Sequence, residues 1–190
     1  MNWNFSVLAY GALVVSVAGC ATARVRPVSP RPNLVIAADN APAAIRFGAE
    51  VHDDFVIPGN SSIGEVRVDA WTWTLTEAFR NGFRRYQSSS RRISLDAADL
   101  SFSPASVNGI GGTVAVTATI RYRARLLDAR GATLAETAGT VHARDVTTSA
   151  SGLTDNAAQA VEAMFEALAR EWFVTPPVSP VPTTSPPLSR

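Results

Sequence analysis

The chain has 190 residues, 46% of them hydrophobic, and its 17 basic and 16 acidic side chains leave a net charge of +1. This length fits one domain of ordinary size with terminal extensions. The near-neutral charge argues against a general nucleic-acid binder, which needs a strong basic excess. The single cysteine excludes an internal disulfide framework and a multi-cysteine metal site.

Residues 1–19 are predicted to be an export signal. Phe5 to Val17 form an uncharged apolar segment, and Val17-Ala18-Gly19 then lead directly into Cys20. An apolar segment of about 7–15 residues followed by small residues is typical of a secretory signal peptide. The Val-Ala-Gly-Cys sequence resembles the lipobox of bacterial lipoproteins. This resemblance implies cleavage before Cys20, and then acyl chains on both its thiol and its new amino group.

Several acyl chains together would hold the protein on a membrane, whereas one chain binds only marginally. Ala21 follows the cysteine, where the resemblance would place an aspartate for retention in the inner membrane. We therefore expect a lipid-anchored protein on the periplasmic face of the outer membrane. The alternative is an uncleaved anchor, because the uncharged segment up to Ala23 is just long enough to cross a bilayer.

Both ends of the mature chain are rich in proline. Residues 20–33 contain Pro27, Pro30 and Pro32, and we interpret them as the lipidated cysteine followed by an extended tether. Residues 174–190 contain six prolines and are predicted to be a disordered tail. The domain itself is expected over residues 34–173.

The first half of this domain predicts a strand, a loop and a helix. Apolar and polar residues alternate over 45–52, as in a half-buried strand, and Pro58 to Ser62 read as a loop. Residues 64–87 are expected to form a helix, because apolar residues recur there at steps of three and four. Trp71 belongs to this stripe. Trp73 does not, and is therefore exposed as a possible contact residue or covered by the 53–62 loop.

The second half predicts three strands and a helix. The first strand begins near Ile93, and its alternation breaks between residues 97 and 100, which indicates a bulge. Strict alternation over 113–126 predicts a long strand with one wet face. A tight turn at 128–131 leads to a partner strand at about 132–147. The closing helix is expected to be capped by Thr154-Asp155-Asn156 and to bury one apolar stripe: Ala158, Val161, Met164, Phe165, Leu168 and Trp172.

These elements predict an α+β fold in the order β-α-β-β-β-α. Each helix has one apolar face, and so has the long strand. A two-layer arrangement buries all three apolar faces, with an antiparallel-rich sheet of about four strands and both helices on one side. The opposite side of the sheet would then be rich in threonine and arginine, and open to solvent or to a partner.

Arg121, Arg123 and Arg125 lie on that open side and form a candidate anion-binding row. Pairing with acidic neighbours or simple solvation is the alternative. Asp53 and Asp54 adjoin His52, but without a further ligand nearby we interpret them as solvated loop charges rather than a metal site. The sequence has no recognisable nucleophile, zinc or phosphate-loop motif, so we do not expect an enzyme.

The order of elements is similar to that of the YajG-type outer-membrane lipoproteins, and more distantly to the LptE and PqiC lipoproteins. The similarity lies in the helix around Trp71, the strand pair from Gly112 to Glu136 and the closing helix. It implies an envelope accessory protein or scaffold that binds a protein partner. Its alternative implication is an auxiliary of lipid or LPS transport that binds anionic headgroups. No cofactor is expected beyond the lipid on Cys20, and no nucleic acid.

Overall fold

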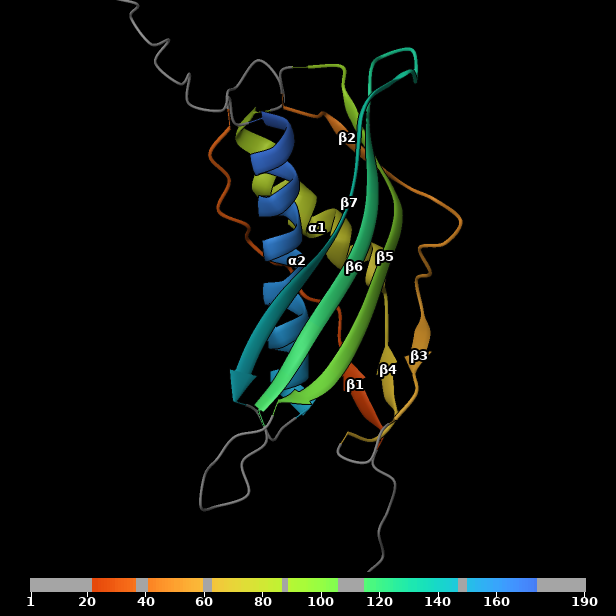
Figure 1. The fold of residues 1–190 in the computed structure, drawn as a ribbon, viewed down its shortest axis with the longest axis vertical. Coiled ribbons are helices and arrows are strands. Elements are labelled where there is room, and N and C mark those ends of the chain that lie inside the picture. The colour runs from red at the N-terminus through yellow and green to blue at the C-terminus, as the bar shows by residue number, and fades with distance from the viewer. Residues whose placement is uncertain are drawn as a thin grey trace, which may run out of the picture.

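The computed structural model describes residues 22–36, 41–59, 63–86, 89–105, 115–146 and 150–173. The predicted signal peptide, Cys20 and the predicted tail lie outside these residues. The described residues form two sheets and two helices (Figure 1). The elements in chain order are β1 (Ala23–Val25), β2 (Ala44–Phe47), β3 (Phe55–Ile57), β4 (Val66–Val68), α1 (Trp71–Phe83), the 3-10 turn η2 (Arg84–Tyr86), β5 (Arg92–Ala105), β6 (Ala115–Leu127), β7 (Thr133–Val146) and α2 (Ala150–Phe173).

The larger sheet confirms the predicted α+β architecture. Its strand order is β2-β5-β6-β7, with β5, β6 and β7 mutually antiparallel and the short β2 parallel to β5. Both helices lie behind this sheet (Figure 1). On β6, Ala118, Ile120 and Ala124 are fully buried beneath the helices, whereas Arg121 and Arg123 face outward. Strict alternation therefore placed this strand and its two faces correctly.

A second, three-stranded sheet was not predicted. Its order is β1-β4-β3, with β1 parallel and β3 antiparallel to β4. Here the expected helix start at residue 64 is wrong, because Val66 and Val68 are buried strand residues and the helix begins only at Trp71. Ala70 adopts the left-handed conformation, with φ of 48°, and this separates the strand from the helix.

The expectation of a free tether up to residue 33 also differs from the structure. Ala23 to Val25 form β1, and Val25 is only 2% exposed. The following N-terminal strap, residues 26–34, runs along both helices. The backbone N–H groups of Arg31 and Asn33 donate to the carboxylates of Glu162 and Glu166 of α2, at 2.7 and 3.0 Å. The proline-rich segment is thus extended, as predicted, but it is docked on the helices of the domain and is not a free tether.

The strap also fits closely against α1. A Cβ atom on Gly82 would lie 2.8 Å from the Leu34 side chain and 3.0 Å from that of Pro32. The glycine therefore permits the close approach of strap and helix. Asn81 fixes the same contact by donating from Nδ2 to the carbonyl of Pro30 at 2.8 Å.

The acidic pair Asp53-Asp54 caps α1 from a distant part of the chain. The helix has no cap from its own preceding residue, since Ala70 offers no side-chain acceptor. The Asp53 carboxylate instead accepts hydrogen bonds from the N–H and hydroxyl of Thr72, and Asp54 accepts one from the N–H of Ala70 at 2.9 Å. The unpaired donors of a helix start are satisfied in this way.

Replacing this cap is expected to weaken the fold moderately. Asp53→Ala should lower the free energy of unfolding by about 1 to 2 kcal/mol, because the first turn of α1 loses its acceptor. Urea denaturation followed by circular dichroism measures the change. Asp155→Ala, which removes an exposed carboxylate within α2, is the control and should change stability by less than about 0.5 kcal/mol.

The antiparallel strands match their predicted limits closely. The expected bulge is present, but the register shifts between Leu95 and Ala97, slightly before the predicted step. The 128–131 turn is confirmed: Gly131 has φ of 89°, and its N–H donates to the carbonyl of Asp128 at 3.1 Å. Glycine is the residue that adopts this conformation without strain.

The closing helix differs from its prediction at the N-terminus. α2 begins at Ala150, so Thr154-Asp155-Asn156 is not its cap but lies inside it. Asn156 is fully buried and donates from Nδ2 to the carbonyl of Val116 at 3.0 Å. Val161, Met164, Phe165 and Leu168 are buried as expected, whereas Phe173 takes the terminal core position assigned to Trp172.

Aromatic rings join the helices behind the sheet. Phe83 of α1 lies 6.3 Å from Phe165 and 6.0 Å from Phe173 between ring centroids, edge to face in both cases. Such pairs add to the stabilisation from apolar burial. This cluster holds α1 and α2 as one layer against the sheet.

Candidate binding surfaces

The three arginines predicted to form an anion-binding row do share the outer face of β6. Arg121, Arg123 and Arg125 alternate with buried residues of the same strand. Their cross-strand neighbours on β7 are Thr140, Ala138 and Glu136, in that order. The three arginines therefore lie in a row on one face of the sheet, and their capacity to bind an anion depends on the acidic groups beside them.

Arg125 is held by a carboxylate that the bulge presents. Its Nε and Nη2 donate to the two oxygens of Asp96 at 2.7 and 2.9 Å, and the Ser94 hydroxyl donates to the same carboxylate at 2.9 Å. The hydrogen bonds from Arg125, aided by that of Ser94, lower the pKa of Asp96 below the ordinary value of 3.8, although burial acts in the opposite direction. This bidentate pair is satisfied within the domain.

The lowered pKa gives a testable pH dependence. Because the folded state holds the Asp96 proton more weakly than the unfolded chain, the pair stabilises the fold above the ordinary aspartate pKa and loses this effect as pH falls through the lowered value. Asp96→Asn should therefore destabilise the protein more at pH 7 than at pH 3, which lies below the ordinary aspartate pKa. Urea denaturation at both pH values measures this. Equal destabilisation at both would contradict the assignment, with Asp99→Asn as the same-strand control.

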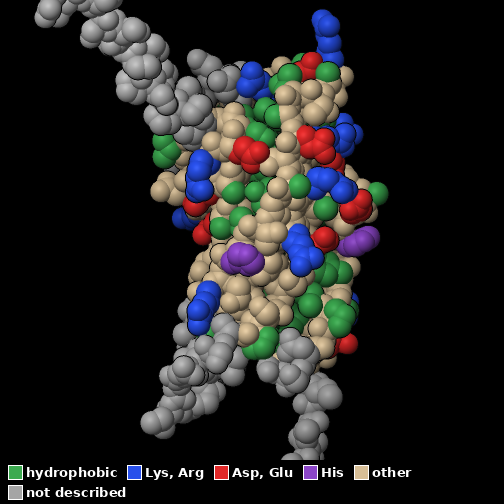
Figure 2. Space-filling view, viewed as in Figure 1, with side chains coloured by type: hydrophobic (Ala, Val, Ile, Leu, Met, Phe, Trp, Pro, Cys, Tyr) green, Lys and Arg blue, Asp and Glu red, His purple; other side chains and the backbone are tan. Residues whose placement is uncertain are grey.

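Arg123 is also paired with a carboxylate. Arg123 Nη2 lies 2.8 Å from Glu50 Oε1, between side chains that are both substantially exposed. Among the described residues, no acidic group lies within ion-pair distance of the Arg121 guanidinium. Figure 2 shows basic and acidic side chains interspersed over this side of the molecule rather than one continuous basic patch. The row therefore leaves one arginine for an external anion.

A shallow depression lies beside Arg121 on the outer face. It has a volume of about 450 Å³. Its lining comes from β5, β6, β7 and the segment after β2: Glu50, Ala97, Asp99, Arg121, Tyr122, Arg123, Ala138, Gly139 and Thr140. The depression opens next to β7, which is the last strand of its sheet and pairs with no further described strand. Exposed backbone groups of such an edge can pair with another chain.

The two tryptophans of α1 have different surroundings. Trp71 is 1% exposed and donates from Nε1 to the carbonyl of Ala98 at 3.1 Å, as its place in the apolar stripe predicted. Trp73 is 46% exposed, so the described part of the 53–62 loop, residues 53–59, does not bury it. An exposed tryptophan offers a large apolar contact area, and Trp73 remains a candidate contact residue.

Asp53 and Asp54, the two carboxylates beside His52, have a structural role, because they cap the start of α1. No group of three or more potential metal ligands is found within the described part of the chain. His142 on β7 lies with Nδ1 2.9 Å from the Thr119 hydroxyl of β6, a cross-strand contact on the outer face.

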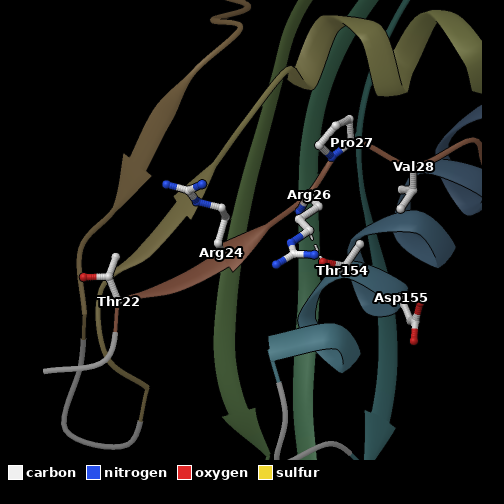
Figure 3. Close-up of a pocket in the computed structure, with 7 residues that line it drawn as sticks. All are labelled: Thr22, Arg24, Arg26, Pro27, Val28, Thr154 and Asp155. Carbon is white, nitrogen blue, oxygen red and sulfur yellow. Dashed lines mark hydrogen bonds between the residues drawn. The ribbon is translucent and has the colours of Figure 1, made fainter. Parts of the chain in front are cut away.

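A cavity larger than the depression beside Arg121 lies at the start of the described chain, and the sequence does not predict it. It has a volume of about 660 Å³ and is shown in Figure 3. The lining residues come from β1 and the residue before it, the strap and the first turns of α2: Thr22, Arg24, Arg26, Pro27, Val28, Thr154 and Asp155. The alternation of apolar and charged residues from Ala23 to Arg26 was the available signal for a strand here.

The predicted lipid site, Cys20, lies outside the described residues. It precedes Thr22, the first residue that lines this cavity, by two positions in the sequence. No helix within the ranges given above is long and apolar enough to span a membrane.

Comparison with known proteins identifies the fold only. No protein-family model and no curated protein matches the sequence. A solved structure from Xanthomonas campestris, described as a DUF330 protein, aligns with a TM-score of 0.53 over 77% of this chain and 91% of its own, at 14% identity. A minor lipoprotein from Acinetobacter baumannii aligns with a TM-score of 0.42 over 74% of this chain and 92% of its own, at 9% identity. The first likeness supports a shared fold, and the resemblance to YajG-type proteins stays a prediction.

Proposed function

We propose that this chain is a bacterial envelope lipoprotein, anchored by acyl chains on Cys20 at the periplasmic face of the outer membrane. Its domain acts as a non-enzymatic accessory module that binds an envelope protein. The lipobox supports the anchor. The observation that carries the binding role is the outer face of the larger sheet, which no described helix covers and which ends at β7, a strand that pairs with no further described strand.

The chemistry of this face suits a protein partner. Arg123 and Arg125 already hold Glu50 and Asp96, so the face presents few uncompensated charges that a partner would have to desolvate. Ala138 and Thr140 are exposed small side chains on β7 beside the depression. They leave room for an additional strand or loop to approach the edge.

The alternative is an auxiliary of lipid or LPS transport that binds anionic headgroups through the arginine row. It is less well supported, because a phosphate would compete with carboxylates for two of the three guanidinium groups. Arg121 alone is free of such competition among the described residues. Under this alternative, changing Arg121, Arg123 and Arg125 together to serine abolishes lipid binding. Under the proposed function, the protein partner is retained.

In vivo crosslinking tests the proposed binding face. We expect Ala138→Arg to remove the crosslinked partner, because it places a bulky charge beside the β7 edge. Ala129→Arg, in the exposed turn between β6 and β7, is the matched control and should retain the partner. Partner recovery from purified membranes is quantified by mass spectrometry after circular dichroism confirms that both variants fold. Equal recovery with both variants would exclude this face.

The anchor is tested separately. Mass spectrometry of the N-terminal peptide should show an acylated Cys20, and Cys20→Ala should move the protein from the membrane to the soluble periplasmic fraction. An unmodified cysteine in a membrane-bound protein would instead support the uncleaved anchor.

A further inference from the structure

The lipid anchor predicted on Cys20 is separated from the folded domain by very few residues. Only Ala21 and Thr22 lie between Cys20 and the first residue of β1. Because one residue spans at most about 3.6 Å, the Cα atoms of Cys20 and Ala23 lie within about 11 Å of each other. The strap that follows is docked on the helices and adds nothing to this reach. An anchor so short fixes which end of the domain lies next to the membrane.

That end is defined by contacts between elements far apart in the sequence. The N–H of Arg26 donates to the Thr154 hydroxyl of α2 at 3.2 Å, and Asn156 reaches the carbonyl of Val116 at the start of β6. The start of α2, the start of β6 and β1 therefore lie together. The 128–131 turn lies at the other end of β6, whose 13 residues span about 40 Å.

The end next to the anchor carries arginine side chains around an open cavity (Figure 3). Arg24 pairs with Asp69 at 3.1 Å, but its side chain remains 56% exposed. The guanidinium of Arg26 has no acid within ion-pair distance in the described part of the chain. Thr22 and Thr154 add hydroxyl groups to the lining, and Asp155 adds one carboxylate. Guanidinium and hydroxyl donors around an open cavity match the acceptor oxygens of a phosphate.

We propose that this end rests on the membrane and that Arg24 and Arg26 bind the phosphates of lipids in the leaflet that holds the anchor. This inference rests on the proposed acylation of Cys20. The long strands of the larger sheet then extend away from the membrane, from the start of β6 at the anchored end to the 128–131 turn about 40 Å away. The outer face of this sheet and the β7 edge remain open to a partner in or beside the same membrane.

Distance measurements on the full, acylated protein in vesicles test this orientation. Because Cys20 would be blocked by lipid, a thiol-reactive fluorophore labels only an introduced cysteine. We place it at Asp155 beside the cavity or at Ala129 in the far turn, both exposed. With a quencher attached to lipid headgroups, we expect strong loss of emission from the Asp155→Cys label and little from the Ala129→Cys label. Similar quenching of both labels would overturn the proposed orientation.

A longer linker separates tethering from headgroup binding. Ten Gly/Ser residues inserted between Ala21 and Thr22 add a root-mean-square span of about 17 Å, so the domain can leave the surface. On vesicles containing anionic lipid, the label should stay partly quenched through the arginines. Arg26→Ser in this background should reduce the bound-to-free ratio roughly five-fold, whereas Arg130→Ser in the far turn should not. An equal effect of the two substitutions would overturn phosphate binding at the cavity.

The anchor and the orientation fail in distinguishable ways. Mass spectrometry of the reconstituted protein first establishes whether Cys20 is acylated. Absence of lipid would refute the proposed anchor, and this orientation with it. An acylated protein in which both labels are quenched equally would support the anchor and refute only the proposed orientation of the domain.

Discussion

Trp71→Ala is expected to lower the free energy of unfolding by about 3 to 5 kcal/mol. The side chain is 1% exposed at the start of α1, where it donates to the carbonyl of Ala98 on β5 and meets the ring of Phe55 on β3 edge to face. It therefore joins the helix layer to both sheets. Truncation leaves a cavity and an unpaired carbonyl at this junction. Urea denaturation followed by circular dichroism measures the change.

Trp73→Ala provides the matched control in the same helix. The residue is 46% exposed, so its removal should change the free energy of unfolding by less than about 0.5 kcal/mol. If Trp73 contacts a partner, this variant loses binding while its stability is unchanged. Comparable destabilisation by the two substitutions would contradict the assigned positions of the tryptophans.

Val25→Asp is expected to destabilise the domain by about 3 kcal/mol or more. Val25 is 2% exposed in β1, where it pairs with Val68 of β4. A carboxylate at this position would be buried against the apolar side chain of Val68. The change should also loosen the strap, because the hydrogen bond from Arg26 to Thr154 follows directly. Thermal unfolding of the purified chain measures the loss.

Val35→Asp tests whether this effect is specific to β1. Val35 follows the strap and is 78% exposed, so an added carboxylate there remains solvated and should be nearly neutral. If residues 20–33 were a free tether, as the sequence suggests, the two substitutions would have equally small effects. A difference of several kcal/mol would establish that β1 belongs to the folded domain.

The elements with a long, regular pattern were predicted well. The alternation along β6 defined its length, its buried face and the outward position of Arg121, Arg123 and Arg125. Gly131 indicated the turn that joins β6 to β7, because positive φ favours glycine. Such signals are local, since each depends on residues within one element.

The three short strands were not recognisable as a sheet. Strands β1, β3 and β4 each have three residues, too few for a periodic pattern to separate them from loop or helix. Nothing in the sequence indicates that Ala70 is left-handed, and so nothing indicates that the helix starts after it. Asp53 and Asp54 reach the start of α1 only because the chain folds back between them and the helix, and their local sequence indicates solvated loop charges instead.

The sequence by itself determined the α+β class, the order of the long elements, the side of the sheet that faces out and the predicted lipid site at Cys20. These follow from periodicity, turn residues and one local motif. The tertiary structure alone decided which arginines have acidic partners and whether the proline-rich start is a tether or a docked strap. Both depend on residues that are distant along the chain and close in space: Glu50 beside Arg123, and Glu162 and Glu166 beside the strap. No local pattern encodes such contacts, because packing of the whole domain brings them together.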